Sequence, residues 1–224
     1  MNYHIGTSLI LQEFKPSCEC PLCKIEKIVE ENILFQFLND AVMEDDTRAR
    51  VNKLGFCADH FDMLFARQNK LSVALQSITR TNALKKEIAA KDAKSAKKAA
   101  ESLKKLTSTC IVCDIVGDHM TRYAKTVAQL YANEGDFRDR LLSTKGFCMK
   151  HYAMLLEHSA CAGGRAKSYL ADLCALEKRH LDRMTDELQW FCDKHDYRNR
   201  EKPLGASADA LPRIRVKLYG EKKQ

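Results

Sequence analysis

A pair of motifs that occurs twice along the chain constrains the fold more than any other feature of the sequence. Each copy opens with Cys-x2-Cys and closes with Gly-Phe-Cys-x2-His, and 33 or 34 residues separate the last cysteine of the first motif from the cysteine of the second. The eight Cys and His residues are Cys20, Cys23, Cys57 and His60 in the first copy and Cys110, Cys113, Cys148 and His151 in the second. The copies are offset by 90 to 91 residues, which indicates an internal duplication.

Each copy carries enough ligands for one metal ion. Three thiolates and one imidazole complete the tetrahedral shell of zinc and leave no open position, as is typical of structural sites. We therefore predict two zinc sites. The alternatives are iron–sulfur clusters, which can use the same residue types, and redox-active dithiols.

The spacing leaves the pairing of the ligands open. Each repeat could close its own set, or the two repeats could exchange partners. Self-contained repeats need fewer coincidences, so we expect each copy to close on itself. Cys18 lies two residues before Cys20 and could replace it as a ligand.

The number of cysteines bears on the compartment. The sequence has ten, and its start lacks the basic and apolar regions of a secretory signal. No apolar run is long enough to span a bilayer, so we expect a cytoplasmic protein with no membrane partner. In a reducing compartment, metal binding explains many cysteines better than disulfides do.

The remaining pattern predicts an all-α protein, a bundle of long helices built from two pseudo-repeats. Glycine and proline are scarce, at nine and four residues, and apolar residues recur at helical spacing. We expect a helix over residues 21–43, a short element that ends at Gly55, and a helix that runs on from Phe56 past residue 106. A long amphipathic helix should follow the break at Gly163-Gly164.

The composition divides the chain into four parts. The predicted parts are a first Cys/His helical repeat (1–84), a Lys/Ala-rich exposed helix or linker (85–106), a second Cys/His helical repeat (107–198) and a basic C-terminal extension (199–224). The formal charge of +7 is concentrated in residues 85–105 and in the extension, whereas the rest of the chain is slightly acidic. These basic segments leave nucleic acid as an alternative partner, although residues 85–105 contain no aromatic side chain that could stack on a base.

Other polar residues offer a second kind of site. An Arg-x-Arg pair precedes each Gly-Phe-Cys, and a third Cys-x2-His lies near residue 195 without a Cys-x2-Cys partner. The candidate ligand-binding residues are Arg48, Arg138, Cys192, His195, Tyr197 and Arg198. Ion pairs and helix packing explain these residues at least as well. We find no catalytic constellation in the sequence, which favours a protein that is not an enzyme.

The motifs resemble those of a family of bacterial proteins of unknown function, frequent in anaerobic Firmicutes. Its members carry "CPLC…GFCxxH" twice and finish on a "KHDYR" segment, which corresponds here to residues 20–23, 55–60, 110–113, 146–151 and 194–198. The resemblance implies an all-helical Cys/His-rich domain and no activity. Some members carry a transporter substrate-binding label, which the start of this chain does not support. The family's "EPWG" is "KPLG" here, at residues 202–205.

These observations favour a metal-stapled helical module, with two zinc ions, that binds an unknown protein or small molecule. The competing hypothesis is a redox or electron-transfer protein that uses the same Cys/His sets.

Overall fold

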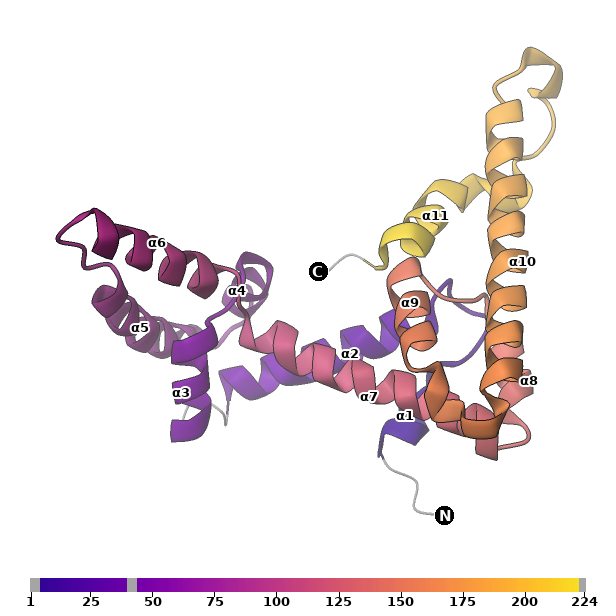
Figure 1. The fold of residues 1–224 in the computed structure, drawn as a ribbon. Coiled ribbons are helices and arrows are strands. Elements are labelled where there is room, and N and C mark those ends of the chain that lie inside the picture. Colours follow the sequence, from indigo (N-terminus) through magenta and orange to yellow (C-terminus); the bar gives the residue numbers. More distant parts are fainter. Residues whose placement is uncertain (1–4, 40–43, 222–224) are drawn as a thin grey trace. The chain divides into compact units, whose positions relative to one another are not determined.

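The structure, a computed structural model, describes residues 5–39 and 44–221. Within these residues every regular element is a helix: eleven α-helices and three 3-10 helices, with no strand (Figure 1). The predicted all-α class is confirmed. None of these helices is long and apolar enough to cross a membrane.

The described chain forms two compact units, and each contains both early and late parts of the sequence. The first unit consists of residues 5–26 and 120–221, and the second of residues 27–39 and 44–119. Helices α2 (Pro21–Leu38) and α7 (Ile111–Asn133) each contribute to both units. The unit boundaries thus fall within these two helices.

The first unit is built around one long helix. Its elements are α1 (Ile5–Glu13), the start of α2, the later part of α7, α8 (Phe137–Ser143), α9 (Met149–Glu157), η2 (Ser159–Arg165), α10 (Ala166–Asp193), η3 (Tyr197–Asn199), η4 (Gly205–Asp209) and α11 (Ala210–Tyr219). The ring of Phe14 packs between those of Phe137 and Phe147, at centroid distances of 5.5 and 5.9 Å. The predicted break before α10 occurs at Gly163, where φ is +55°.

The second unit contains the shorter helices. Its elements are the rest of α2, α3 (Asp45–Leu54), α4 (Ala58–Phe65), α5 (Lys70–Glu87), α6 (Ala93–Thr107) and the start of α7. Helix α5 packs on α3, α4 and α6, and Figure 1 shows α5 and α6 as neighbouring helices. Side chains of α5 also close the end of α2: the Ser72 hydroxyl donates to the Leu38 carbonyl, and the Gln76 amide donates to the Phe37 carbonyl.

The prediction of one helix from Phe56 past residue 106 is wrong, because two side-chain caps interrupt it. The Asn69 carboxamide oxygen accepts the Ser72 N–H and starts α5. Asp92 and Ser95 form a reciprocal capping box that starts α6. Asn and Asp compete with a continuous helix in this way because their short side chains bind the free N–H groups of a new first turn.

The ends of two other predicted elements can be compared directly. The element that should end at Gly55 is α3, and Gly55 is its C-terminal cap with φ +66°. Helix α2 begins at Pro21 as predicted and is described to Leu38. The remaining predicted positions, residues 40–43, lie outside the described residues.

Candidate metal centres

The eight predicted ligands form two groups of four, and each group combines the two repeats. Cys20 and Cys23 of the first copy meet Cys148 and His151 of the second; we call this group the outer site, because its ligands flank the other four along the sequence. Cys57 and His60 meet Cys110 and Cys113; we call this group the inner site. The expectation that each repeat closes its own set is therefore wrong, although each site lies within one compact unit.

Helix starts position all the ligands. Cys20 directly precedes α2, and Cys23 lies in its first turn; Cys110 and Cys113 hold the same places at α7. Cys148 caps α9 and Cys57 caps α4, with the histidine three residues on in each case. The positive end of a helix dipole favours thiolates, so each site draws on two such ends.

The glycine of each Gly-Phe-Cys motif makes the turn into the second helix. Gly55 and Gly146 have φ values of +66° and +78°, in the left-handed region that glycine adopts at little cost. The reversal of the chain brings each Cys-x2-His to the start of the helix that carries the Cys-x2-Cys of the other copy. Both motif glycines are thus explained by geometry.

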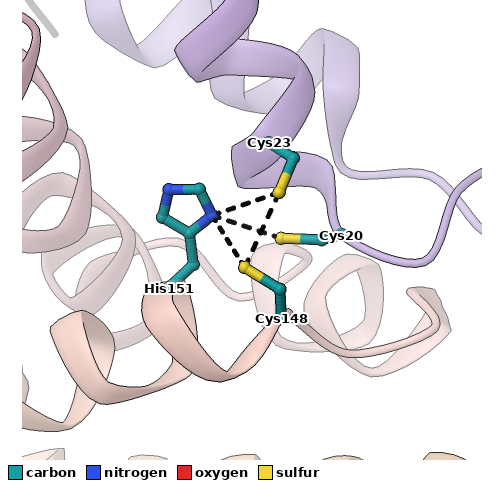
Figure 2. A group of neighbouring side chains, drawn as sticks. All are labelled: Cys20, Cys23, Cys148 and His151. Atoms are coloured by element: carbon teal, nitrogen blue, oxygen red, sulfur yellow. Dashed lines mark hydrogen bonds between the residues drawn. The ribbon is translucent and has the colours of Figure 1, made fainter. Parts of the chain in front are cut away.

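The outer site has the dimensions of a single tetrahedral ion (Figure 2). Cys20 Sγ, Cys23 Sγ and Cys148 Sγ lie 3.4, 3.5 and 3.3 Å from His151 Nδ1. The sulfurs of Cys23 and Cys148 are 3.6 Å apart. Zinc with standard bond lengths would place sulfur about 3.6 Å from nitrogen and about 3.8 Å from sulfur along the edges of its tetrahedron.

The inner site repeats this arrangement. Its three sulfurs, of Cys57, Cys110 and Cys113, lie 3.1, 3.3 and 3.4 Å from His60 Nδ1. The sulfurs of Cys57 and Cys113 are 3.9 Å apart. In both sites all four donor atoms lie within 4.8 Å of one another. The two groups could therefore each hold one metal ion.

A glutamate of α2 contacts the far nitrogen of each histidine. Glu30 Oε1 lies 2.8 Å from His60 Nε2, and Glu26 Oε2 lies 3.4 Å from His151 Nε2. The carboxylate of Glu30 is within hydrogen-bond distance and holds the proton on Nε2 of His60, so that the lone pair of Nδ1 faces the sulfurs, in the tautomer that a metal ion requires. Glu26 lies near Nε2 of His151 as an ion-pair contact without a hydrogen bond.

The thiols influence one another's ionisation. Burial raises the pKa of the Cys20 thiol, whereas hydrogen bonds from Cys20 and Cys23 lower the pKa of the Cys148 thiol. Burial also raises the pKa of Cys110, but hydrogen bonds with His60 and with backbone N–H groups outweigh it and bring this pKa to about 6. Clustered thiols ionise together only when a cation balances their charge, which a divalent metal ion supplies.

The two sites differ in exposure. All four ligands of the outer site are buried. At the inner site His60 and Cys110 are buried, but Cys57 and Cys113 are accessible to solvent. A Cβ atom at Gly220, after α11, would lie 3.7 Å from the sulfurs of both Cys23 and Cys148. The end of α11 therefore covers the outer site.

A buried ion pair fixes this cover in place. Lys217 of α11 is fully buried and donates to the carbonyls of Lys145 and Phe147 and to Glu177, 3.2 Å away. The second oxygen of Glu177 accepts the Phe147 N–H. The loop that delivers Cys148 is thus held by α10 and α11 together.

Four residues that support the two metal sites were not predicted from the sequence: Glu26, Glu30, Lys217 and Gly220. Glu30 carried a usable signal in the sequence, because helical spacing places it on the same side of α2 as the apolar residues Ile33 and Leu34. A charged residue in such a position is seldom buried without a partner.

The other candidate ligand-binding residues lie on exposed surfaces. Arg48 is exposed on α3, and Arg138 forms a bidentate contact with Asp172. The remaining four lie at the end of α10 and just beyond it; they are Cys192, His195, Tyr197 and Arg198, all exposed. Arg198 binds its neighbour Asp196, and the His195 ring packs edge-on against Phe191. Cys18 belongs to neither site.

Comparison with known proteins agrees with the motif pattern. A family model described as "Family of unknown function (DUF6062)" matches residues 1–224. The chain belongs to this family. No curated protein and no solved structure matches it. The DUF6062 assignment therefore supplies membership without an activity, and the inference of function must come from the two sites and the surfaces around them.

Proposed function

We propose that this DUF6062 protein is a helical module stapled by two zinc ions, and that its second unit binds a partner protein. The observation that carries the proposal is the pair of closed Cys3His groups, each with the edge lengths of one tetrahedral ion. Four protein ligands leave no position for a substrate, which favours a structural over a catalytic role.

The donor spacing favours a single ion over a cluster. An iron–sulfur cluster places several irons and sulfides between its ligands, so the cysteine sulfurs around it spread further apart than those around one ion. The sulfurs of Cys23 and Cys148 are only 3.6 Å apart. Zinc is the divalent ion that this thiolate-rich tetrahedral set most commonly binds.

Elemental analysis of the purified chain tests the metal assignment. We expect about two zinc ions per chain and a colourless protein. Less than one zinc per chain would refute the assignment. A brown protein with broad absorption near ~400 nm would instead support the redox alternative, in which the same cysteines hold iron.

The partner-binding part of the proposal is supported by apolar side chains on the surface of the second unit. Leu71, Leu75 and Ile78 follow one another at helical spacing on α5, and all three are exposed, Leu71 by 68%. Phe65 is 58% exposed, and its ring lies 4.2 Å from Lys70 Nζ. We call the residues Phe65, Leu71, Leu75 and Ile78 the apolar stripe. Several exposed apolar side chains on neighbouring helical turns are typical of a binding surface.

The basic residues of α5 and of its neighbour α6 point to an acidic helix as the occupant of the apolar stripe. Helix α5 carries Lys70 at its start and Lys85 and Lys86 in its last turn. The neighbouring α6 has no buried residue and adds five lysines, at positions 94, 97, 98, 104 and 105. An amphipathic helix with apolar anchors and acidic flanks would complement both features.

Two labelled peptides of equal apolar content test this surface. One carries Glu on its flanks and the other Lys, and each is titrated into the full zinc-loaded chain by fluorescence anisotropy. We expect at least tenfold tighter binding of the Glu peptide, loss of that binding in Leu71→Asn/Leu75→Asn, and weakening by salt. Leu211→Asn, at an exposed leucine of the first unit, is the matched control.

Three outcomes would refute the partner assignment. They are equal binding of both peptides, binding that the α5 substitutions leave unchanged, and self-association of the chain that those substitutions abolish. The last result would make a second copy the occupant of the apolar stripe.

A further inference from the structure

The two sites offer the same four donors but differ in what an incoming molecule can reach. The outer site is buried on all four ligands, and Gly220 lies against two of its sulfurs. The inner site exposes the thiolates of two ligands, Cys57 and Cys113. A small oxidant that diffuses in water can therefore reach sulfur only at the inner site without local unfolding.

The two accessible sulfurs are also neighbours. Cys57 Sγ and Cys113 Sγ lie 3.9 Å apart, and they come from different helix starts, those of α4 and α7. A disulfide bond needs these two sulfurs at about 2 Å, so the pair must close by roughly half of its present separation. The more buried Cys110 and His60 are shielded from the same encounter.

We propose that the inner site is an oxidant-sensitive zinc site, at which a peroxide converts Cys57 and Cys113 into a disulfide and releases the ion. The inference rests on the zinc assignment of the proposed function and adds a chemical response at one of its two sites. The outer site keeps its zinc under the same conditions and preserves the fold of the first unit.

The reaction balances with a peroxide as the oxidant. One thiolate attacks a peroxide oxygen, the O–O bond breaks, and the sulfur becomes a sulfenic acid as one water leaves after protonation. The second thiolate attacks that sulfur and displaces hydroxide, which takes up a proton to give a second water. Two electrons pass from the sulfurs to the peroxide, and zinc, left with two ligands, departs as the hydrated dication.

Hydrogen peroxide added to the full-length two-zinc protein tests the proposal. Zinc release is followed with a colorimetric chelator, and disulfides are located by mass spectrometry after free thiols are alkylated. We expect one of the two zinc ions to be released at least tenfold faster than the other, with a peptide linked through Cys57 and Cys113. Reduction in the presence of zinc should restore the second ion.

Two variants separate the proposed chemistry from loss of folding. Cys57→Asp keeps a zinc ligand but removes one thiol, so the protein should still bind two zinc ions and release neither quickly. Cys174→Ser removes an exposed cysteine outside both sites and should leave the release unchanged.

The outcomes distinguish this inference from the zinc assignment. Equal release rates for both ions, no release, or a disulfide within the outer site would overturn the inference while leaving two zinc ions in place. If Cys57→Asp does not bind a second zinc ion, the test is the peptide linked through Cys57 and Cys113 in the unaltered chain. Its presence supports the inference, and its absence overturns it. A protein that purifies without zinc would refute the zinc assignment and this inference with it.

Discussion

Glu26 and Glu30, one helical turn apart on α2, contact the histidines of different sites. Glu30 faces His60 of the inner site and Glu26 faces His151 of the outer site. The equivalent positions of the second repeat, 90 residues later, are Val116 and Met120, which are buried and apolar. The duplication therefore preserves the ligands, but only the first copy carries the carboxylates that contact the histidines.

Removing the charge of Glu30 should weaken one site only. In Glu30→Gln the His60 ring loses the carboxylate that holds its proton on Nε2, and we expect zinc affinity at the inner site to fall about 10- to 100-fold. Competition with a chelator of known affinity measures the zinc affinity of each site. The control is Glu31→Gln, whose carboxylate pairs with Arg67 and not with a ligand. Equal weakening of both zinc ions in Glu30→Gln would contradict the assignment.

The glycine of the second Gly-Phe-Cys motif has no room for a side chain. A Cβ on Gly146 would lie 2.5 Å from Glu177 Oε2 and 2.9 Å from Lys217 Nζ, at a φ of +78°. Gly146→Ala should therefore cost more than the about 1–2 kcal/mol that left-handed backbone alone costs. Gly55→Ala should cost less, since its nearest neighbour is the flexible end of Arg80.

Chemical denaturation measures the loss of unfolding free energy in Gly146→Ala and Gly55→Ala, with Gly164→Ala as the control. Gly164 has no atom within 4 Å of the added Cβ, so its substitution should change the unfolding free energy little. A Gly146→Ala variant as stable as Gly164→Ala would show that the pair of Glu177 and Lys217 does not hold the loop.

At the scale of elements, α10 and α11 act together as a clasp on the loop that carries Cys148. Lys217 lies between α10 and that loop and is fully buried, so its charge is balanced by Glu177 and by two carbonyls. Burial raises the pKa of Glu177 despite the attraction of Lys217. Burying this ion pair costs free energy of desolvation. Removing either Lys217 or Glu177 alone would leave the other charge buried without its counter-ion.

A histidine of α10 should make the first unit sensitive to acid. Burial, followed by the charges of Lys217, Arg183 and Arg179, lowers the pKa of His180 to about 4. On acidification the unfolded chain binds this proton near pH 6.5 and the folded chain only near pH 4. The free energy of unfolding should therefore fall as the pH falls through this window.

The variant His180→Asn removes that proton from both states. With zinc in excess, its unfolding free energy should fall less between pH 7 and pH 5.5 than that of the unaltered chain, as measured by urea denaturation at each pH. Identical losses in the two proteins would contradict the lowered pKa.

At the scale of the whole molecule, the exchange of ligands between repeats gives a prediction that self-contained repeats would not. Cys57→Ser removes a ligand of the inner site, so it should release one zinc ion and loosen the start of α7, around Cys110 and Cys113. The segment around Cys20 and Cys23 should stay protected, because its ion is held by Cys148 and His151. Hydrogen exchange followed by mass spectrometry reports both segments.

The opposite pattern would restore the self-contained pairing. Protection lost at Cys20 and Cys23 but kept at Cys110 and Cys113 would mean that Cys57 is a ligand with the first pair. Cys174→Ser, outside both sites, provides the control for the loss of a thiol.

Local signals account for what the sequence predicts well. Helical periodicity, the proline that opens α2 and the glycines at positions 55 and 163 act over a few residues, and each appears in the structure as expected. The caps at Asn69 and Asp92 were equally local and could have been identified. The ligand types follow from the repeated motif in the same way.

The pairing of the ligands could not be predicted, because it depends on packing between distant segments. Both pairings use identical residue types at nearly identical spacing, so the motif alone does not distinguish them. The difference in exposure between the sites has the same origin: Gly220 reaches Cys23 and Cys148 only because α11 packs on α9 and α10. No pattern within either repeat encodes that contact.

The order of the ligands along the chain has a consequence for synthesis on the ribosome. The inner site joins residues up to 56 positions apart and lies wholly within the interval that the outer site spans, where Cys23 and Cys148 are 125 positions apart. The two loops are nested, so the inner one can close first and shorten the span left to the outer one without threading. Cys20 and Cys23, which emerge before the other ligands, must wait for His151 before their ion is enclosed, and during that interval the nascent chain carries a pair of unprotected thiols.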